Sequence, residues 1–193
     1  SNNKFNPLNL CRENVKLLDP YTSARDEYVS NGNKMIFLDA NENPNETGVN
    51  RYPDPLQRSL RTEIAILKNV TENQLLFGNG SDEVLDLLFR AFCEPNKDAV
   101  ITFPPTYGMY GVLAAINSVQ VHEIPLTTSF NIDIEGYRKK QYSKAKILFI
   151  CSPNNPSGNL MDSMHVEEIL QTFDGLVVVD EAYIDFTESQ SWS

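Results

Sequence analysis

Apolar residues recur with helical spacing in two segments of the chain. From Leu56 onward, and again across residues 163–173, they fall three or four positions apart, so they share one face of an α-helix. These positions are Leu56, Leu60, Ile64 and Leu67 in the first segment and Val166, Ile169, Leu170 and Phe173 in the second. Asp162 precedes the second segment and is a suitable N-cap, because its carboxylate can accept a hydrogen bond from the first turn.

Short apolar runs elsewhere predict β-strands. The predicted strands cover residues 34–39, 74–77, 99–103, 119–124, 145–151 and 174–180. One further helix opens at residues 78–83 and runs through Phe92, and another follows Pro104-Pro105 through about Ala115. Strands that alternate with helices predict an α/β fold, with a mostly parallel sheet and helices on both faces. Residues 40–55 contain three prolines and several asparagines, which predicts a loop.

The last strand carries the most informative pattern. In Leu176-Val-Val-Val-Asp-Glu-Ala-Tyr183, four apolar residues run directly into Asp180, which is typical of a strand buried on both faces. Ligands of open α/β sheets bind at the carboxyl ends of the strands, so we expect Asp180 to face a cationic group. A Walker B strand has the same form, but it requires a GxxxxGK[ST] loop, and the chain contains no Gly-Lys dipeptide.

Composition limits the class of protein. The 193 residues suffice for one domain with a core, or for one domain with a small appendage. The net charge of −10 argues against a general binder of nucleic acid or of a membrane surface. No apolar run approaches the ~20 residues that span a bilayer, and the N-terminus lacks the apolar segment of a signal peptide. Three widely spaced cysteines without a CxxC pair fit reduced thiols, so we expect a cytoplasmic protein.

Residues 78–83 form a glycine-rich turn before a helix. Free N–H groups and the helix dipole at Gly80, Ser81 and Asp82 favour an anion such as a phosphate. A helix that is merely well capped is an equally open interpretation. The turn is not a dinucleotide fingerprint, because Glu83 takes the place of its third glycine.

Two further loops follow predicted strands. Tyr107, after Pro104-Pro105, can lay its ring on a flat ligand, although a core tyrosine is the alternative interpretation. Asn155 lies between two prolines that fix the backbone, and it offers an amide donor, although a plain turn has the same pattern. With Asp180 and the nearby phenol of Tyr183, these groups describe a flat aromatic ligand with a phosphate at one end and a basic ring nitrogen at the other. Pyridoxal phosphate fits each requirement, and no metal site is expected.

Several motifs together resemble a known family. They are Leu38-Asp-Ala-Asn-Glu-Asn-Pro44, Asn50-Arg-Tyr-Pro53, Gly80-Ser-Asp-Glu83, Arg90-Ala-Phe-Cys-Glu-Pro95, Pro104-Pro-Thr-Tyr-Gly-Met-Tyr110, Cys151-Ser-Pro-Asn-Asn-Pro156 and Asp180-Glu-Ala-Tyr183. Over nearly the whole chain the sequence resembles the fold-type I pyridoxal-phosphate aminotransferases, and within them the histidinol-phosphate aminotransferase branch. The pair of motifs Pro-Asn-Asn-Pro and Asp-Glu-Ala-Tyr is specific to the superfamily. Ser157 replaces the more usual threonine, a conservative departure.

The resemblance implies a role for each residue at the cofactor. Asp180 pairs with the pyridine nitrogen and keeps it protonated, which makes the ring an electron sink. Asn155 and Tyr183 hydrogen-bond the ring 3′-oxygen, and Tyr107 stacks on the ring. The phosphate is held by Gly80, Ser81 and Asp82, and by Tyr52 from the neighbouring subunit of a homodimer. Tyr21 and Asn41 resemble substrate-side positions.

The resemblance also implies that some catalytic residues lie elsewhere. In the family the Schiff-base lysine and the arginines for the cofactor phosphate and the substrate carboxylate follow Asp-Glu-Ala-Tyr, whereas no Lys or Arg follows Lys146 here. We therefore expect an N-terminal part of a longer protein that is inactive alone and leaves an apolar sheet edge exposed. Residues 1–30 would be an arm of the small domain, and residues 31–193 an incomplete cofactor-binding large domain.

The implied activity of the full-length protein is transamination between L-histidinol phosphate and 2-oxoglutarate, in histidine biosynthesis. Imidazole acetol phosphate and glutamate are then the products. A related pyridoxal-phosphate enzyme, such as an aromatic aminotransferase or a threonine-phosphate decarboxylase, is one alternative. A non-catalytic binding or dimerisation fragment is another.

Overall fold

The computed structural model describes residues 6–21, 36–139 and 142–193, and it divides the chain into two compact units. The first unit contains the residues up to Leu17 and those from Phe77 to Ser193, and the second contains Leu18–Leu76. Each unit is described by itself. Among the residues described, no helix is both long enough and apolar enough to cross a membrane.

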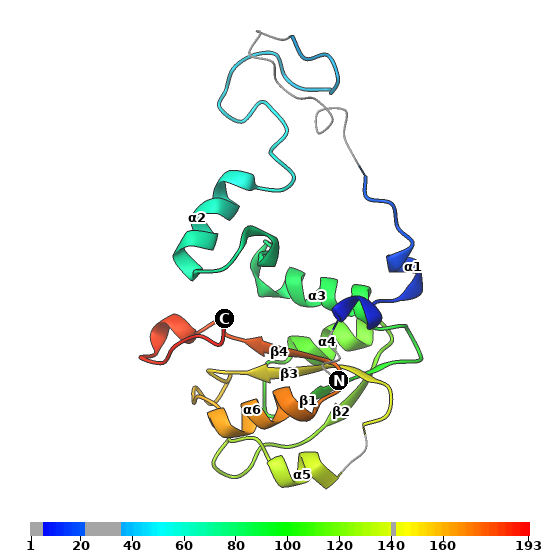
Figure 1. Ribbon diagram of the computed structural model, residues 1–193, viewed down its shortest axis with the longest axis vertical. Helices are drawn as coiled ribbons and strands as arrows, with labels where there is room; N and C mark the ends of the chain where they lie inside the picture. The colour runs from blue at the N-terminus through cyan, green and yellow to red at the C-terminus, as the bar shows by residue number, and fades with distance from the viewer. Residues whose placement is uncertain (1–5, 22–35, 140–141) are drawn as a thin grey trace. The chain divides into compact units, whose positions relative to one another are not determined.

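A parallel sheet forms the centre of the first unit (Figure 1). Its strands are β1 (Ala99–Thr102), β2 (Gln120–Glu123), β3 (Ala145–Cys151) and β4 (Leu176–Asp180). They lie in the order β2-β1-β3-β4, and every neighbouring pair is parallel. All four carboxyl ends therefore point to one edge of the sheet, as the alternation of strands and helices predicted.

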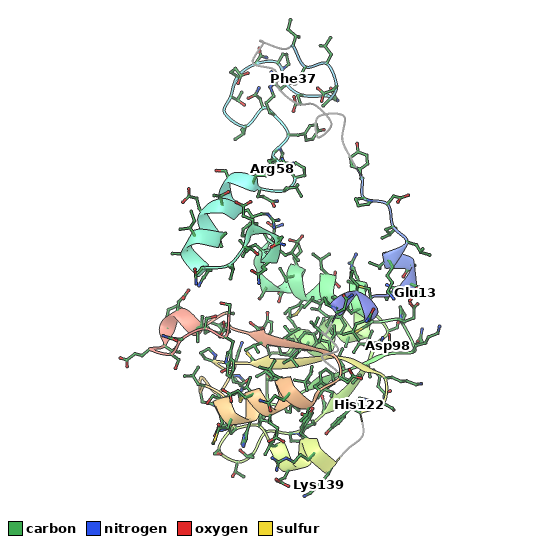
Figure 2. The ribbon with its side chains drawn as sticks, viewed as in Figure 1. Glu13, Phe37, Arg58, Asp98, His122 and Lys139 are labelled. Carbon is green, nitrogen blue, oxygen red and sulfur yellow. The ribbon has the colours of Figure 1, made fainter. Side chains whose placement is uncertain are left out.

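Helices cover both faces of this sheet (Figure 1). α3 (Gly80–Phe92) and α4 (Met109–Ile116) pack on one face, and α5 (Ile134–Lys139) and α6 (Ser163–Thr172) pack on the other. The side chains between the layers form two apolar clusters (Figure 2). The first is centred on Phe89, Tyr110 and Phe149, and the second on Ile101, Ile150 and Ile169. The α/β fold with helices on both faces is confirmed.

The N-cap of α6 is the residue that the sequence predicted, but α5 was not predicted as a helix. The Asp162 carboxylate accepts a hydrogen bond from the N–H of Met164 at 2.9 Å, which confirms it as the N-cap of α6. α5 is only six residues long, too short to show a helical repeat in the sequence. It begins beside Asp133, whose carboxylate accepts a hydrogen bond from the N–H of Gly136.

The first unit also contains short elements near its termini. They are η1 (Pro7–Asn9), α1 (Glu13–Lys16) and η3 (Ile184–Phe186). Arg12 attaches the N-terminal segment to α3: its guanidinium donates to the carbonyl of Arg90 at 3.0 Å and pairs with Glu94 at 3.2 Å.

The expectation that β4 is buried on both faces is wrong for this chain. All five residues of β4 are only half-buried, whereas β1 is buried throughout. β4 is the last strand in the sheet order and pairs only with β3 among the residues described. Its side chains do contact the clusters on both faces, but they have strand neighbours on one side only.

The second unit contains α2 (Arg58–Lys68) and η2 (Glu72–Gln74), and the described residues of two predicted strands, 34–39 and 74–77, form no strand. Residues 36–39 form no strand, and residues 34–35 of that prediction lie outside the described part. Around residue 75 the guanidinium of Arg61 donates to the carbonyls of Glu72, at 2.7 Å, and Leu75. A side chain thus satisfies the carbonyl of Leu75, which a strand would offer to a neighbouring strand.

α2 begins two residues later than its apolar repeat. The Asp54 carboxylate accepts hydrogen bonds from the N–H groups of Leu56 (3.0 Å) and Arg58 (2.9 Å), so it caps the helix at Arg58. Hydrogen bonds from the main chain of Arg58 and Leu56 lower the pKa of Asp54.

Candidate functional site

Asp180 lies at the carboxyl end of β4, where the sequence predicted it. It is paired in register with Cys151 of β3, and its carbonyl accepts a hydrogen bond from the N–H of Ser152 at 3.0 Å. The loop after β1 begins at the same edge, because β1 is parallel to β3. The structure therefore places Asp180 at the same sheet edge as the starts of the two loops that carry Tyr107 and Asn155.

The Asp180 carboxylate is held by two donors. The hydroxyl of Tyr110 donates to Oδ2 at 2.7 Å, and the N–H of Ala182 donates to Oδ1 at 3.2 Å. Tyr110 is 1% exposed, and its ring stacks on Phe149 with centroids 4.8 Å apart. Burial, followed by the charge of Asp180, raises the pKa of Tyr110, so the phenol stays protonated and remains a donor.

Tyr107 joins the loop after β1 to the start of α3. Its hydroxyl donates to Oδ1 of Asp82 at 3.0 Å, and this hydrogen bond raises the pKa of Tyr107. Its ring meets Tyr110 edge to face, with centroids 5.6 Å apart and an interplanar angle of 87°. Tyr107 is half-buried and packs against the first apolar cluster, so its stacking on a ligand stays a prediction.

The glycine turn forms the predicted helix start. Gly80 has φ +78°, a left-handed conformation that glycine adopts without the steric cost of a Cβ. The carboxylate of Glu83 turns back and accepts hydrogen bonds from the N–H (2.5 Å) and the side-chain amide (3.2 Å) of Asn79. Ser81 is exposed and Asp82 half-buried. The helix is thus capped by its own Glu83, and the binding of an anion at Gly80, Ser81 and Asp82 stays a prediction.

The loop after β3 divides its two asparagines between different surroundings. Asn154 is 2% exposed and hydrogen-bonds Thr106 (3.0 Å), the carbonyl of Pro105 (3.0 Å) and Ser157 (2.7 Å). Asn155 is half-buried, and none of the hydrogen bonds described uses its side chain. Asn154 thus clamps the loop against the loop after β1 and leaves the neighbouring Asn155 amide available.

A cavity of about 330 Å³ lies beside this loop. It is lined by Pro153, Asn154, Asn155, Pro156, Gly158, Tyr183, Phe186 and Thr187. The structure therefore places Asn155 and Tyr183 on one cavity, although they are 28 residues apart in the sequence. Tyr183 is 48% exposed and packs against Phe186 with ring centroids 6.4 Å apart.

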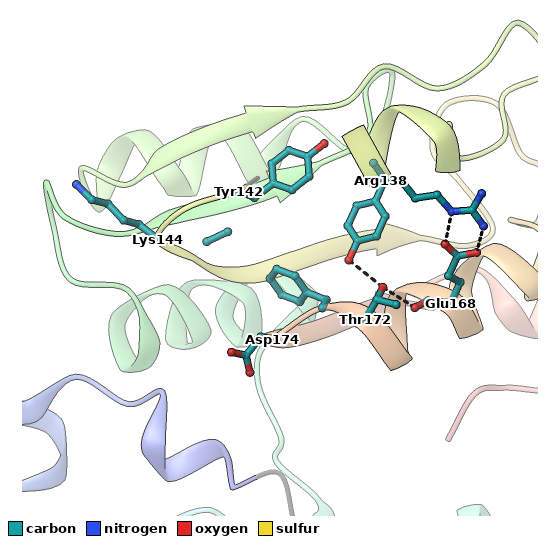
Figure 3. Close-up of a pocket in the computed structure, with 9 residues that line it drawn as sticks. Arg138, Tyr142, Lys144, Glu168, Thr172 and Asp174 are labelled. Atoms are coloured by element: carbon teal, nitrogen blue, oxygen red, sulfur yellow. Dashed lines mark hydrogen bonds and ion pairs between the residues drawn. The ribbon is translucent and has the colours of Figure 1, made fainter. Parts of the chain in front are cut away.

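A larger cavity of about 540 Å³ lies at the opposite end of the sheet (Figure 3). It borders Ala145, the first residue of β3, about 20 Å along the strand from the carboxyl end. Arg138 and Glu168 close one side through two hydrogen bonds of 2.6 Å, which lower the pKa of Glu168. None of the predicted site residues lines it, so its size does not make it the better candidate.

Three predicted residues lie in the second unit. Tyr21 and Tyr52 are 93% and 68% exposed, and Asn41 is exposed as well. The N–H of Tyr52 donates to Oε1 of Glu42 at 2.8 Å, which fixes its main chain and leaves its ring exposed. Their roles toward a substrate or a second subunit stay predictions.

One residue of the site was not predicted from the sequence. Tyr110 lies three positions after Tyr107 in the first turn of α4, and it contacts Asp180, 70 residues away. Only the Tyr-Gly-Met-Tyr spacing, which puts both rings near one helix start, could have indicated it.

Comparison with known proteins places this geometry in a family. The family model for aminotransferase class I and II matches residues 28–193. The histidinol-phosphate aminotransferase of Flavobacterium johnsoniae is 58% identical over 191 residues, which are 98% of this chain and 55% of that protein. The chain thus spans about half the length of this curated relative.

Solved structures agree on the fold. The histidinol-phosphate aminotransferase from Clostridium acetobutylicum matches with a TM-score of 0.64 and 26% identity, over 74% of this chain and 42% of that one. The enzyme from Sinorhizobium meliloti, solved in complex with pyridoxal-5′-phosphate, matches with a TM-score of 0.61 over 70% of this chain and 37% of that one. At 22% identity, this second likeness shows the fold alone. Because the family model covers most of the sequence, the chain belongs to the class I and II aminotransferase family.

Proposed function

We propose that the full-length protein is a pyridoxal-phosphate-dependent aminotransferase that exchanges an amino group between L-histidinol phosphate and 2-oxoglutarate. The observation that carries the proposal is the arrangement at the carboxyl edge of the sheet, where Asn155 and Tyr183 share a cavity and Tyr110 links Asp180 to the ring of Tyr107. The 58% identity to a histidinol-phosphate aminotransferase supports the choice of substrate.

The residues present fit this cofactor. An aromatic ring that carries a basic nitrogen needs a carboxylate, and Asp180 offers one that two donors already orient. The 3′-oxygen of the ring needs hydrogen-bond donors, and the amide of Asn155 and the phenol of Tyr183 line one cavity without a partner among the hydrogen bonds described. The phosphate would lie at the start of α3, at Gly80, Ser81 and Asp82, where the first N–H groups of the helix have no acceptor within it.

Pyridoxal phosphate, when bound, supplies a conjugated ring that accepts electrons from the substrate Cα. The role of Asp180 is to hold a proton on the ring nitrogen, because a negative carboxylate at that atom favours its charged form. Tyr107 would lie against the ring, with its hydroxyl anchored on Asp82. Asn155 and Tyr183 would fix the ring in its plane through the 3′-oxygen.

We also propose that the protein works in the cytoplasm as a homodimer, in which Tyr52 reaches the phosphate site of the second subunit. The exposed ring of Tyr52 supports this role, and three free cysteines suit a reducing compartment. Tyr21 and Asn41 would contact the substrate. The Schiff-base lysine would come from a part of the full-length protein outside this sequence.

The test is a substrate comparison on the full-length protein loaded with pyridoxal phosphate. We expect turnover of L-histidinol phosphate with 2-oxoglutarate to exceed that of L-phenylalanine, and we expect no release of CO₂ from O-phospho-L-threonine. Asp180→Asn should lower kcat/KM by about 10²–10³, because it removes one preorganised electrostatic contact. Asp174→Asn, an equivalent change at an exposed carboxylate of the larger cavity, should leave kcat/KM unchanged. Absence of turnover with histidinol phosphate in the wild type would contradict the proposal.

A further inference from the structure

The support behind Asp180 comes from a buried tyrosine rather than from a charged group. Tyr110 donates to Oδ2 of Asp180 at 2.7 Å, an ordinary length for a hydrogen bond from a hydroxyl. The other carboxylate oxygen accepts only a longer hydrogen bond, from the N–H of Ala182 at 3.2 Å. The shorter of the two hydrogen bonds therefore comes from Tyr110.

The surroundings of Tyr110 leave its hydroxyl little freedom. Its ring stacks on Phe149, which stacks in turn on Phe89 with centroids 5.4 Å apart, and Tyr107 meets its edge. Tyr110 is 1% exposed, so water does not compete for the hydroxyl. The phenol also stays neutral, because its pKa is raised by burial and by the charge of Asp180. A fixed neutral donor orients the carboxylate and adds no charge of its own near the ring nitrogen.

The same helix start carries two functions. Tyr107 and Tyr110 are three residues apart at the beginning of α4, so one short segment holds both the predicted ring plate and the support of Asp180. The ring of Tyr110 is fixed in turn by its stack on Phe149 of β3.

We propose that Tyr110 is a positioning residue that holds the Asp180 carboxylate aimed at the pyridine nitrogen of the cofactor. The inference rests on the cofactor part of the proposed function and not on the identity of the substrate. Tyr110 acts through Asp180 and has no direct role toward the substrate.

The test is Tyr110→Phe in the full-length protein, which removes one oxygen atom and keeps the ring stack. With pyridoxal phosphate labelled with ¹⁵N at the ring nitrogen, we expect the ¹⁵N resonance at fixed pH to move toward that of unprotonated pyridine. We also expect the dissociation constant of the cofactor to rise about tenfold, the scale of one hydrogen bond to a charged group. Tyr137→Phe is the matched control: Tyr137 is also buried, its hydroxyl bonds Thr172 in the other cluster, and neither readout should change.

A double-mutant cycle separates positioning from a general packing effect. In an Asp180→Ala background, which removes both acceptor oxygens, Tyr110→Phe should have no further effect on the dissociation constant, since its target is gone. An equal effect of Tyr110→Phe in both backgrounds would overturn the inference, as would an unchanged ¹⁵N resonance in the single variant. Failure of the proposed function is seen separately, in the wild type, as absent cofactor binding or absent turnover of histidinol phosphate. If the wild type does not bind the cofactor, the inference about Tyr110 is refuted as well. If the wild type binds the cofactor but does not turn over histidinol phosphate, the inference about Tyr110 still holds.

Discussion

Replacing Asn154 with alanine should destabilise the protein, because this side chain clamps two loops of the site edge. Asn154 is 2% exposed and makes three side-chain hydrogen bonds, to Thr106, Pro105 and Ser157. A hydrogen bond of this kind contributes about 1 kcal/mol net, so the loss of three lowers the free energy of unfolding by about 3 kcal/mol. The measurement is urea unfolding of the full-length protein without cofactor, followed by tyrosine and tryptophan fluorescence.

Asn155→Ala provides a matched control from the next position. The Asn155 side chain is half-buried and takes part in none of the hydrogen bonds described, so its removal should change the free energy of unfolding by less than about 0.5 kcal/mol. The same change should weaken the binding of pyridoxal phosphate if Asn155 contacts the ring. A destabilisation equal to that of Asn154→Ala, or an Asn154→Ala variant within about 1 kcal/mol of the wild type, would refute the division of roles between the two asparagines.

Three further predictions concern other parts of the structure. Gly80→Ala should destabilise the protein by about 1 kcal/mol, because Gly80 has φ +78°. Gly111→Ala, in α4 and with equal space for a Cβ, should stabilise the protein by a similar amount. Thermal unfolding measures both variants, and a change of the same sign in both would contradict the backbone argument. The hydrogen bonds from Arg138 lower the pKa of Glu168 below its ordinary value of 4.5. These hydrogen bonds therefore contribute fully to stability above pH 4.5, and the contribution is lost as the pH falls through the lowered pKa. The difference in Tm between the wild type and Arg138→Ala should therefore shrink below about pH 4.5, and a constant difference from pH 7 to pH 3 would disprove it. Burial raises the pKa of the Cys93 thiol to about 12, so iodoacetamide at pH 8 should modify Cys93 only after unfolding; peptide mass mapping of the native protein would reveal any earlier labelling.

Much of the fold could be predicted because its signals are local. The apolar run of β3 matched its observed bounds, Ala145–Cys151, and Asp162 caps α6 as its side chain allows. The alternation of strands and helices was enough to predict a parallel sheet, since such connections place helices on the faces. The ends of parallel strands then had to meet at one edge, which is why four scattered motifs could be combined into one candidate site.

The wrong predictions concern features that depend on a partner. Residues 36–39 and 75–77 include the apolar residues that predicted strands, but no strand lies beside them among the described residues. The guanidinium of Arg61 donates a hydrogen bond to the carbonyl of Leu75 instead. β4 has the composition of a buried central strand yet is half-buried at the end of the sheet order. The amino-acid composition of a strand indicates the environment for which the strand is suited. The exposure of its side chains depends on which neighbouring strands and helices are present.

The sequence by itself determined the fold class, and it predicted the sheet edge of the candidate site and the chemical character of that site, because periodicity and strand-end residues are properties of short segments. Only the tertiary structure decided that Tyr110 supports Asp180 across 70 residues, that Asn154 is the clamp while Asn155 is available, and that Tyr183 shares a cavity with Asn155. These contacts join residues far apart in the chain, and the direction of a side chain across such a distance depends on how the sheet and its helices pack.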